Sequence, residues 1–364
     1  MYAGRVVAVG KTSAPFVCYR VSSNSFPDRA AKISRGKVKI SLKPGIKTSN
    51  QYVEYNCIAK VGKAVIASNG KHTDLIAKNF SSGMPMKEAI YSALSRMGYE
   101  KDGHNTPRIA GAFLGSKGYL GIIRKGGIEI QEFPLRAGSC RIVSTNSFTS
   151  LSENEYAFEA ADAKDCARFI SEGHFFCKLK SFVCSAAYLG GYSTYNPNVP
   201  TPAQALALLK KAGCSQKVIL HCKTVRRIAL KLLDKYRIKA DRQLVETGSL
   251  LHDIGRAKDH GIQHGLYSYQ ALRELDLPLE ICLIALHHVG SGIDRQTAVE
   301  LGLPPADYSP ITTEEKLVCF ADILARGDTE LSYEEALEAD SLKFGKNSKY
   351  IRKMKALHCE LTGK

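Results

Sequence analysis

The sequence of 364 residues contains no tryptophan, no two cysteines spaced as Cys-x-x-Cys, and no uninterrupted apolar run of the roughly 18 residues that a membrane span needs. The apolar stretch at residues 6–9 is too short for a secretory signal. The 11 cysteines are scattered, which excludes a disulfide framework and favours reduced, buried thiols. These absences predict a cytoplasmic protein without membrane contact.

The charge is unevenly divided along the chain. Hydrophobic residues at 44% and charged residues at 24% are ordinary globular values and exclude intrinsic disorder. Residues 1–200 hold 27 Lys and Arg against 14 Asp and Glu, whereas residues 201–364 hold 24 against 21. Seven of the 10 histidines lie in the second half. The two halves are therefore expected to carry different chemistry.

The basic first half invites a nucleic-acid-binding interpretation, which we keep as an alternative. Its lysines and arginines are dispersed rather than grouped in blocks, and no RNA-binding aromatic motif accompanies them. A nucleotide-monophosphate substrate accounts for positive charge equally well. Nucleic acid is therefore the disfavoured partner.

A proline-rich segment divides the chain. Pro197, Pro200 and Pro202 fall within six residues and interrupt regular structure. We expect a first domain over 1–198, a linker over 199–204 and a second domain over 205–364.

The hydrophobic pattern changes at this boundary. Before it, short β-branched runs alternate with glycine-rich turns, with helical periodicity only at Met86–Met97 and Ala160–Glu172, which predicts an α+β domain. Strands are expected at residues 5–10, 38–42, 61–68, 109–114, 119–124, 127–133 and 182–189. Beyond it, apolar residues recur at helical spacing. Helices are expected at residues 203–212, 218–236, 244–251, 266–275, 279–286, 314–324 and 333–339.

Four polar clusters interrupt the strands of the first half, at residues 19–29, 55–57, 69–74 and 99–109. Each one alone is most simply a turn, because Asn, Ser, Gly and Pro serve turns for backbone reasons. Their content favours a binding pocket, since arginines with hydroxyls suit a phosphate and a lone carboxylate suits proton transfer.

Together with the opening residues 1–5, these clusters resemble the archaeal-type IMP cyclohydrolases over about residues 1–198. The resemblance implies a four-layer αββα fold of the N-terminal-nucleophile-hydrolase type. It also implies cyclisation of 5-formamidoimidazole-4-carboxamide ribonucleotide to IMP and water in purine biosynthesis, without a cofactor. The substrate carries both reacting groups, so the enzyme has to align them, move protons and stabilise charge.

The same resemblance assigns the site residues. It implies Glu100 as the proton-transfer group and Arg29 as the residue that positions the substrate or stabilises charge. By motif position it implies substrate contacts from Tyr19, Arg20, Ser22, Tyr55, Asn56, Asn69, Asn105, Thr106 and Arg108. Which of these hold the phosphate and which the base stays open.

Two features depart from the family pattern. The chain begins Met1-Tyr2, whereas N-terminal-nucleophile hydrolases need Ser, Thr or Cys at position one, so self-processing hydrolysis is not expected. Asn24 and Asp28 stand where the typical segment has Arg and Asn, so one basic group near the site is missing and weaker phosphate affinity is expected.

In the second half, polar residues fall on the apolar faces of the expected helices. His221 shares a stripe with Val225 and Ile228, and the adjacent His252 and Asp253 end a helical pattern. Farther along, Asp322 follows an apolar residue by one helical turn. A single histidine of this kind is most simply a hydrogen-bonded core residue, but four buried polar groups together need a common partner.

The set of His221, His252, Asp253 and Asp322 resembles the metal ligands of the HD superfamily of helical phosphohydrolases, over roughly residues 203–330. A mixed imidazole and carboxylate set suits Mn, Fe, Co, Ni or Zn. The implied substrate is a phosphorylated small molecule.

A second metal ion could use His264 with His287 or His288, and Arg256 is a candidate phosphate contact. A substrate-contact or solvated role for these histidines is the alternative. The sequence also leaves open a ligand-sensing HD module without turnover, and the formation of a homo-oligomer.

Overall fold

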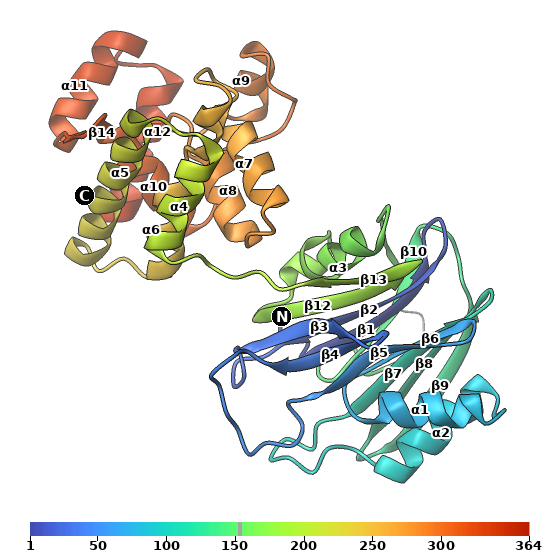
Figure 1. The fold of residues 1–364 in the computed structure, drawn as a ribbon. Coiled ribbons are helices and arrows are strands. Elements are labelled where there is room, and N and C mark those ends of the chain that lie inside the picture. Colours follow the sequence, from blue (N-terminus) through green and yellow to red (C-terminus); the bar gives the residue numbers. More distant parts are fainter. Residues whose placement is uncertain (152–154, 364) are drawn as a thin grey trace. The chain divides into compact units, whose positions relative to one another are not determined.

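The computed structural model describes residues 1–151 and 155–363, so Lys364 of the expected second domain lies outside the described residues. The chain forms two compact units, Met1–Asn196 and Pro197–Lys364 (Figure 1). The first is rich in strands and the second is helical, as the hydrophobic pattern predicted.

The first unit contains two antiparallel sheets. The six-stranded sheet has the order β11 (Glu155–Ala157), β10 (Ser139–Ser144), β1 (Arg5–Lys11), β2 (Pro15–Ser22), β12 (Phe182–Leu189) and β13 (Gly191–Tyr195). The seven-stranded sheet has the order β3 (Arg29–Ser34), β4 (Lys37–Leu42), β5 (Tyr55–Val61), β6 (Ala64–Ser68), β7 (Arg108–Leu114), β8 (Lys117–Arg124) and β9 (Gly127–Pro134).

Alternating side chains give each sheet two apolar faces. One face of each sheet contributes to a shared core, and the outer faces are covered by α3 (Ala163–Glu172) on one sheet and by α1 (His72–Ser81) and α2 (Met86–Met97) on the other (Figure 1). Gly111 permits close approach of the sheets, because a Cβ atom there would lie 2.6 Å from Val7. The likeness of this arrangement to the N-terminal-nucleophile hydrolases stays a prediction.

Several elements of the first unit differ from the sequence expectation, and strands β2, β3, β10, β11 and β13 were not predicted. The expected strand at residues 61–68 is a hairpin of β5 and β6 that turns at Gly62, whose φ is +56°. The polar cluster that contains Tyr19 and Arg20 lies within β2 rather than in a turn. The cluster at residues 69–74 continues into α1. This helix was not predicted, because its first residues are polar and establish no apolar period.

The second unit is built from nine α-helices and short connecting elements among the described residues. The helices are α4 (Pro202–Ala212), α5 (Gln216–Lys235), α6 (Arg242–Leu251), α7 (His264–Glu274), α8 (Leu279–His287), α9 (Arg295–Glu300), α10 (Thr313–Ile323), α11 (Tyr333–Phe344) and α12 (Lys349–Thr362). The minor elements are η1 (Phe176–Lys178) in the first unit, and η2 (Ile254–Ala257), β14 (Ala325–Arg326) and β15 (Thr329–Glu330) in the second.

The expected linker over 199–204 extends too far. Helix α4 begins at Pro202, which occupies its first position, and Thr201 caps it through a hydrogen bond from the Gln204 amide. Proline is well tolerated at a first helical position because that N–H needs no partner in the helix. Helices α9 and α12 were not predicted. No helix of the described residues is both long and apolar enough to cross a membrane.

Candidate functional site

A buried carboxylate lies between two guanidinium groups in the first unit. Glu100 follows α2 in a loop, and its backbone amide donates to the Thr106 carbonyl at 2.8 Å. Arg5 at the start of β1 and Arg108 at the start of β7 each place a guanidinium nitrogen 3.4 Å from one Glu100 oxygen. Only 2% of Glu100 is exposed. Arg5 was not among the predicted site residues, although it opens a strand that the pattern predicted.

The surroundings of Glu100 allow its carboxyl group to gain and lose a proton near neutral pH. Burial raises the pKa of Glu100 to about 7, although Arg5 and Arg108 act to lower it. A group that titrates near the working pH can both accept and return a proton.

Two cavities adjoin this cluster. One of about 150 Å³ is lined by Glu100, Arg108, Tyr55 and Tyr52 among others. A larger one of about 530 Å³ is lined by Arg5 and by residues of the loops that follow β2, α2 and β10. Its lining includes Ser23, Asn24, Thr106, Thr145 and Asn146. The last two were not foreseen, because a polar turn after a strand carries no distinguishing signal.

Tyr55 and Arg29 provide further polar groups. The hydroxyl groups of Tyr19 and Tyr55 lie 2.7 Å apart in the core between the sheets. Arg29 donates through Nε to the Phe26 carbonyl, while its Nη2 atom is buried without a hydrogen bond to any described residue. A buried donor of this kind costs free energy unless it finds a partner, which favours a ligand group at this position.

Four of the implied contact residues form hydrogen bonds within the protein. Arg20 is fully buried, and its guanidinium donates to backbone carbonyls in α3 and the segment after it. Its Nε donates to Ser22. The Asn56 amide donates to Asp74, and Asn69 bridges the Pro107 carbonyl and the Ile109 amide. Successive residues of a strand face opposite ways, so Tyr19 and Arg20 cannot line the same pocket.

The loop between Glu100 and Arg108 is held by Asp102. Its carboxylate accepts from the His104 and Thr106 amides and from the Thr106 hydroxyl. Asn105 is exposed and has a φ of +51°, a left-handed conformation that asparagine tolerates. The loop therefore fixes Glu100 while leaving Thr106 at the edge of the larger cavity.

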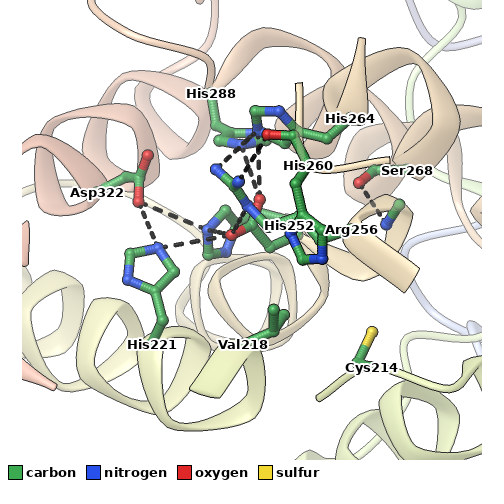
Figure 2. Close-up of polar contacts among 12 residues, drawn as sticks. Cys214, Val218, His221, His252, Arg256, His260, His264, Ser268, His288 and Asp322 are labelled. Carbon is green, nitrogen blue, oxygen red and sulfur yellow. Dashed lines mark hydrogen bonds and ion pairs between the residues drawn. The ribbon is translucent and has the colours of Figure 1, made fainter. Parts of the chain in front are cut away.

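The second unit gathers histidines and carboxylates from five helices (Figure 2). His221 comes from α5, His252 and Asp253 from the end of α6, His264 from the start of α7, and Asp322 from α10. His288, at the end of α8, completes the cluster. Three subsets could each hold a metal ion, namely His221, His252 and Asp253; His252, His288 and Asp322; and Asp253, His264 and His288.

The distances in this cluster are short. The Asp253 Oδ2 atom lies 3.6 Å from Nε2 of both His221 and His252, and its Oδ1 atom lies 3.3 Å from His264 Nε2 and 3.4 Å from His288 Nε2. His221 Nε2 lies 2.8 Å from Asp322 Oδ1. Asp253 therefore lies between two groups of imidazoles.

Hydrogen bonds orient the rings. Nδ1 of His252, His264 and His288 lies 2.7, 2.7 and 2.8 Å from the carbonyls of Ser249, Gly261 and Ala285, respectively. These bonds assign the proton of a neutral ring to Nδ1 and leave the Nε2 lone pair free, which is the arrangement of metal-binding histidines. Among the described residues, His252 Nε2 and Asp253 Oδ1 are buried without a hydrogen bond. The donor set therefore fits a divalent transition metal.

The charges of the cluster depend on one another. Burial alone would lower the pKa of His252, but the Asp253 and Asp322 carboxylates outweigh it and raise that pKa to about 8. Burial and the neighbouring His288 lower the pKa of His264 to about 4. Although burial would raise the pKa of Asp322, His221 and His252 hold it well below its usual range.

Three polar residues near the cluster do not belong to the three metal-binding subsets. His287, predicted as an alternative ligand of a second metal ion, points elsewhere and lies 2.7 Å from Glu315 through its Nδ1 atom. Arg256 donates to Asp253 Oδ2 at 2.6 Å. His260 is exposed and is absent from the three metal-binding subsets (Figure 2).

Comparison with known proteins assigns both units to families. Residues 2–191 match the family described as IMP cyclohydrolase-like protein, and residues 218–327 match the HD domain. An IMP cyclohydrolase of Methanococcus aeolicus is 36% identical over 198 residues, which cover 52% of this chain and 97% of that protein. An uncharacterized protein of Methanocaldococcus jannaschii is 41% identical over 161 residues, which cover 43% of this chain and 95% of that protein.

A crystal structure of the HD domain of the L. monocytogenes phosphodiesterase PgpH is 23% identical and covers 43% of this chain and 95% of that one, with a TM-score of 0.29. The first family match includes more than half of the chain. The chain therefore belongs to the IMP cyclohydrolase-like family and carries an HD domain after the cyclohydrolase-like region.

Proposed function

We propose that the first unit is an IMP cyclohydrolase, which closes the ring of 5-formamidoimidazole-4-carboxamide ribonucleotide to give IMP and water. The observation that carries this proposal is the Glu100 carboxylate, buried between Arg5 and Arg108 beside a cavity in a chain of this family. The Methanococcus aeolicus relative bears the name of this activity. The cytoplasmic location, the absence of a cofactor and the N-terminal-nucleophile-hydrolase type of fold belong to the same proposal.

The reaction joins two groups of one molecule. The carboxamide nitrogen attacks the formyl carbon and a C–N bond forms. The C–O bond then breaks, and the former formyl oxygen leaves as water with one proton from the attacking nitrogen and one from the formamido nitrogen, which becomes doubly bonded to the same carbon. Glu100 accepts the proton of the attacking nitrogen and returns it to the departing oxygen, while Arg5 and Arg108 stabilise negative charge beside it. Holding the two groups in their reactive orientation lowers the barrier, because the substrate loses its internal rotational freedom on binding rather than in the transition state.

We assign the remaining residues by their contacts. Tyr55 and Thr106 contact the substrate in this proposal because they line the two cavities, and Arg29 contacts it because its buried Nη2 atom has no hydrogen bond to a described residue. Arg20, Asn56 and Asn69 support the pocket through their internal hydrogen bonds. The test is to incubate the purified chain with the formamido substrate and to follow IMP by its absorbance. Absence of IMP would overturn the proposal.

We propose that the second unit is a metal-dependent phosphohydrolase acting on a phosphorylated small molecule. The observation that carries it is the set of Nε2 atoms and carboxylate oxygens around Asp253. His221, His252, Asp253 and Asp322 would hold one ion of Mn, Fe, Co, Ni or Zn, and His264 with His288 would contribute to a second. A metal bound there would activate a water molecule and polarise a phosphoryl oxygen. Arg256 holds one Asp253 oxygen in place.

Metal analysis and a phosphatase assay test this second proposal together. A catalytic HD domain retains metal through purification and hydrolyses an aryl phosphate in the presence of Mn²⁺. Metal binding without hydrolysis of any phosphoester would instead indicate the ligand-sensing module. A protein without metal affinity would contradict both interpretations.

A further inference from the structure

A third cavity, of about 340 Å³, lies in the second unit, within the size range of small-molecule sites. The loop that follows α8 forms one wall, and residues of α11 and α12 form another. The lining is mainly apolar side chains, namely Ile262, Val289, Ile293, Leu301, Phe344 and Tyr350. The Phe344 and Tyr350 rings stack with centroids 4.4 Å apart.

The polar groups of this cavity are largely engaged with one another. Asp294 accepts from the Lys353 ammonium at 3.0 Å and from the Lys349 ammonium at 2.7 Å, and it caps α9 through Thr297. Lys353 also donates to the Gly292 carbonyl, and the Ser291 hydroxyl donates to the Tyr350 carbonyl. Lys349, whose side chain is 50% exposed, is the more accessible of the two cations. The cavity thus offers an apolar interior with a net positive charge at its edge.

One wall of this cavity is formed by residues that neighbour the histidine cluster along the chain. Val289 follows His288 directly, and Gly265 follows His264 directly. A Cβ atom on Gly265 would lie 2.8 Å from the Val289 side chain, so the cavity wall packs against the helix that carries His264. Consecutive Cα atoms are about 3.8 Å apart, so the wall begins within one residue of a candidate metal ligand.

Part of the cavity lies outside the residues that match the HD domain. The HD match ends at residue 327, whereas Phe344, Lys349, Tyr350 and Lys353 lie beyond it. Helices α11 and α12 therefore contribute part of the cavity wall from outside the matched region.

We infer that this cavity binds an uncharged aromatic ring of the phosphorylated compound whose phosphate reaches the histidine cluster. The ring contacts Leu301 and Phe344, and Lys349 faces the anionic part of the molecule. The inference rests on the proposed phosphohydrolase function and narrows its substrate class to aromatic compounds that carry a phosphate. A nucleobase and a simple aryl group share this chemistry.

The test measures binding rather than turnover, using the full chain loaded with Mn²⁺. The probe is 1-naphthylmethylphosphonate, which phosphoester hydrolysis cannot cleave because its phosphorus is bonded to carbon. Its naphthyl fluorescence can be followed without an indole background, because the chain contains no tryptophan. We expect the probe to bind more tightly than methylphosphonate, and Mn²⁺ to strengthen its binding.

Phe344→Ala and Leu301→Asn should each raise the Kd of the probe on the order of 10-fold, since each removes apolar contact with the ring. Leu342→Ala is the matched control, because Leu342 lies on the same helix, is 81% exposed and does not line the cavity. Unchanged binding in both cavity variants, equal binding of methylphosphonate, or binding indifferent to Mn²⁺ would overturn the inference.

Competition distinguishes the source of the ring. Displacement of the probe by IMP identifies a nucleobase, whereas ring-dependent binding that IMP does not displace identifies another aryl group; both results support the cavity assignment. Tight ring-dependent binding without hydrolysis of any phosphoester would remove the proposed phosphohydrolase function but retain the binding site. Hydrolysis of phosphoesters without any dependence on the aromatic ring would retain the proposed phosphohydrolase function but remove the ring-binding site.

Discussion

The Nε2 atoms of His264 and His288 lie 3.0 Å apart, although the Nδ1 atom of each ring already faces a backbone carbonyl. In two neutral rings oriented in this way, the two lone pairs point at each other. A proton or a metal cation between them would remove this repulsion, and Asp253 Oδ1 lies within 3.4 Å of both nitrogens. The arrangement is most simply explained by a cation that all three residues bind.

Metal content should therefore depend on the residues of the cluster. We expect His252→Ala to lose most of the metal that the native chain retains, because it removes a buried Nε2 atom that has no hydrogen bond to a described residue. The control is His287→Gln, which keeps an N–H donor for Glu315 and should leave the metal content unchanged. Plasma mass spectrometry of the purified proteins measures both. Equal metal in native and His252→Ala proteins would refute the ligand assignment.

The pH dependence of cyclisation should report Glu100. If Glu100 takes the proton from the attacking nitrogen, it must be ionised, so kcat/KM should rise about tenfold per pH unit at low pH and level off above about 7, the raised pKa of this group. A rate that falls as the pH rises through 7 would assign Glu100 as the acid in the first step instead. In Glu100→Gln, the residual rate should have no transition at this pH.

The same raised pKa should affect stability. Burial raises the pKa of Glu100 from 4.5 to about 7, so between these values the folded chain holds a proton that the unfolded chain has lost. The contribution is fully present below the unfolded pKa and is lost as the pH rises through the folded one. The free energy of unfolding should therefore fall by up to about 1.4 kcal/mol per pH unit in this window. Denaturant titrations of native and Glu100→Gln proteins should differ in this slope.

Arg20 should matter for folding rather than for substrate affinity. Arg20→Met leaves several buried carbonyls of α3 and the following segment without their donor, and we expect a loss on the order of 3 kcal/mol in unfolding free energy. The KM of the protein that remains folded should stay within about twofold of the native value, because the substitution removes no contact with the substrate. A large rise in KM with unchanged stability would restore Arg20 to the substrate pocket. Arg35→Met, at an exposed turn, is the control.

The sequence predicted elements with strong periodicity well. The helix at Met86–Met97 and the strand at Phe182–Leu189 have the expected bounds, because each has an uninterrupted apolar pattern. The hairpin of β5 and β6 was missed since its turn is only two residues long. Helix α9 has six residues, which is too short to establish a period.

The candidate sites were predicted unevenly for the same reason. Helical spacing predicted that His221, His252 and Asp322 lie on the buried faces of their helices, because their apolar neighbours define those faces. Spacing could not choose between His287 and His288, since adjacent helical residues point about 100° apart and only the packing of α8 decides which faces inward. Arg5 was missed because a single arginine at the start of a strand is indistinguishable from a surface cation.

The most direct measurement is a spectrophotometric assay of the purified chain with 5-formamidoimidazole-4-carboxamide ribonucleotide, run on the native protein, on Glu100→Gln and after metal chelation. We expect IMP formation by the native protein to survive chelation, because the Glu100 cluster contains no metal-binding set among the described residues. In Glu100→Gln it should fall by a factor on the order of 10² to 10⁴. A native chain that forms no IMP, or a Glu100→Gln variant as active as native, would contradict the assignment of cyclohydrolase chemistry to Glu100.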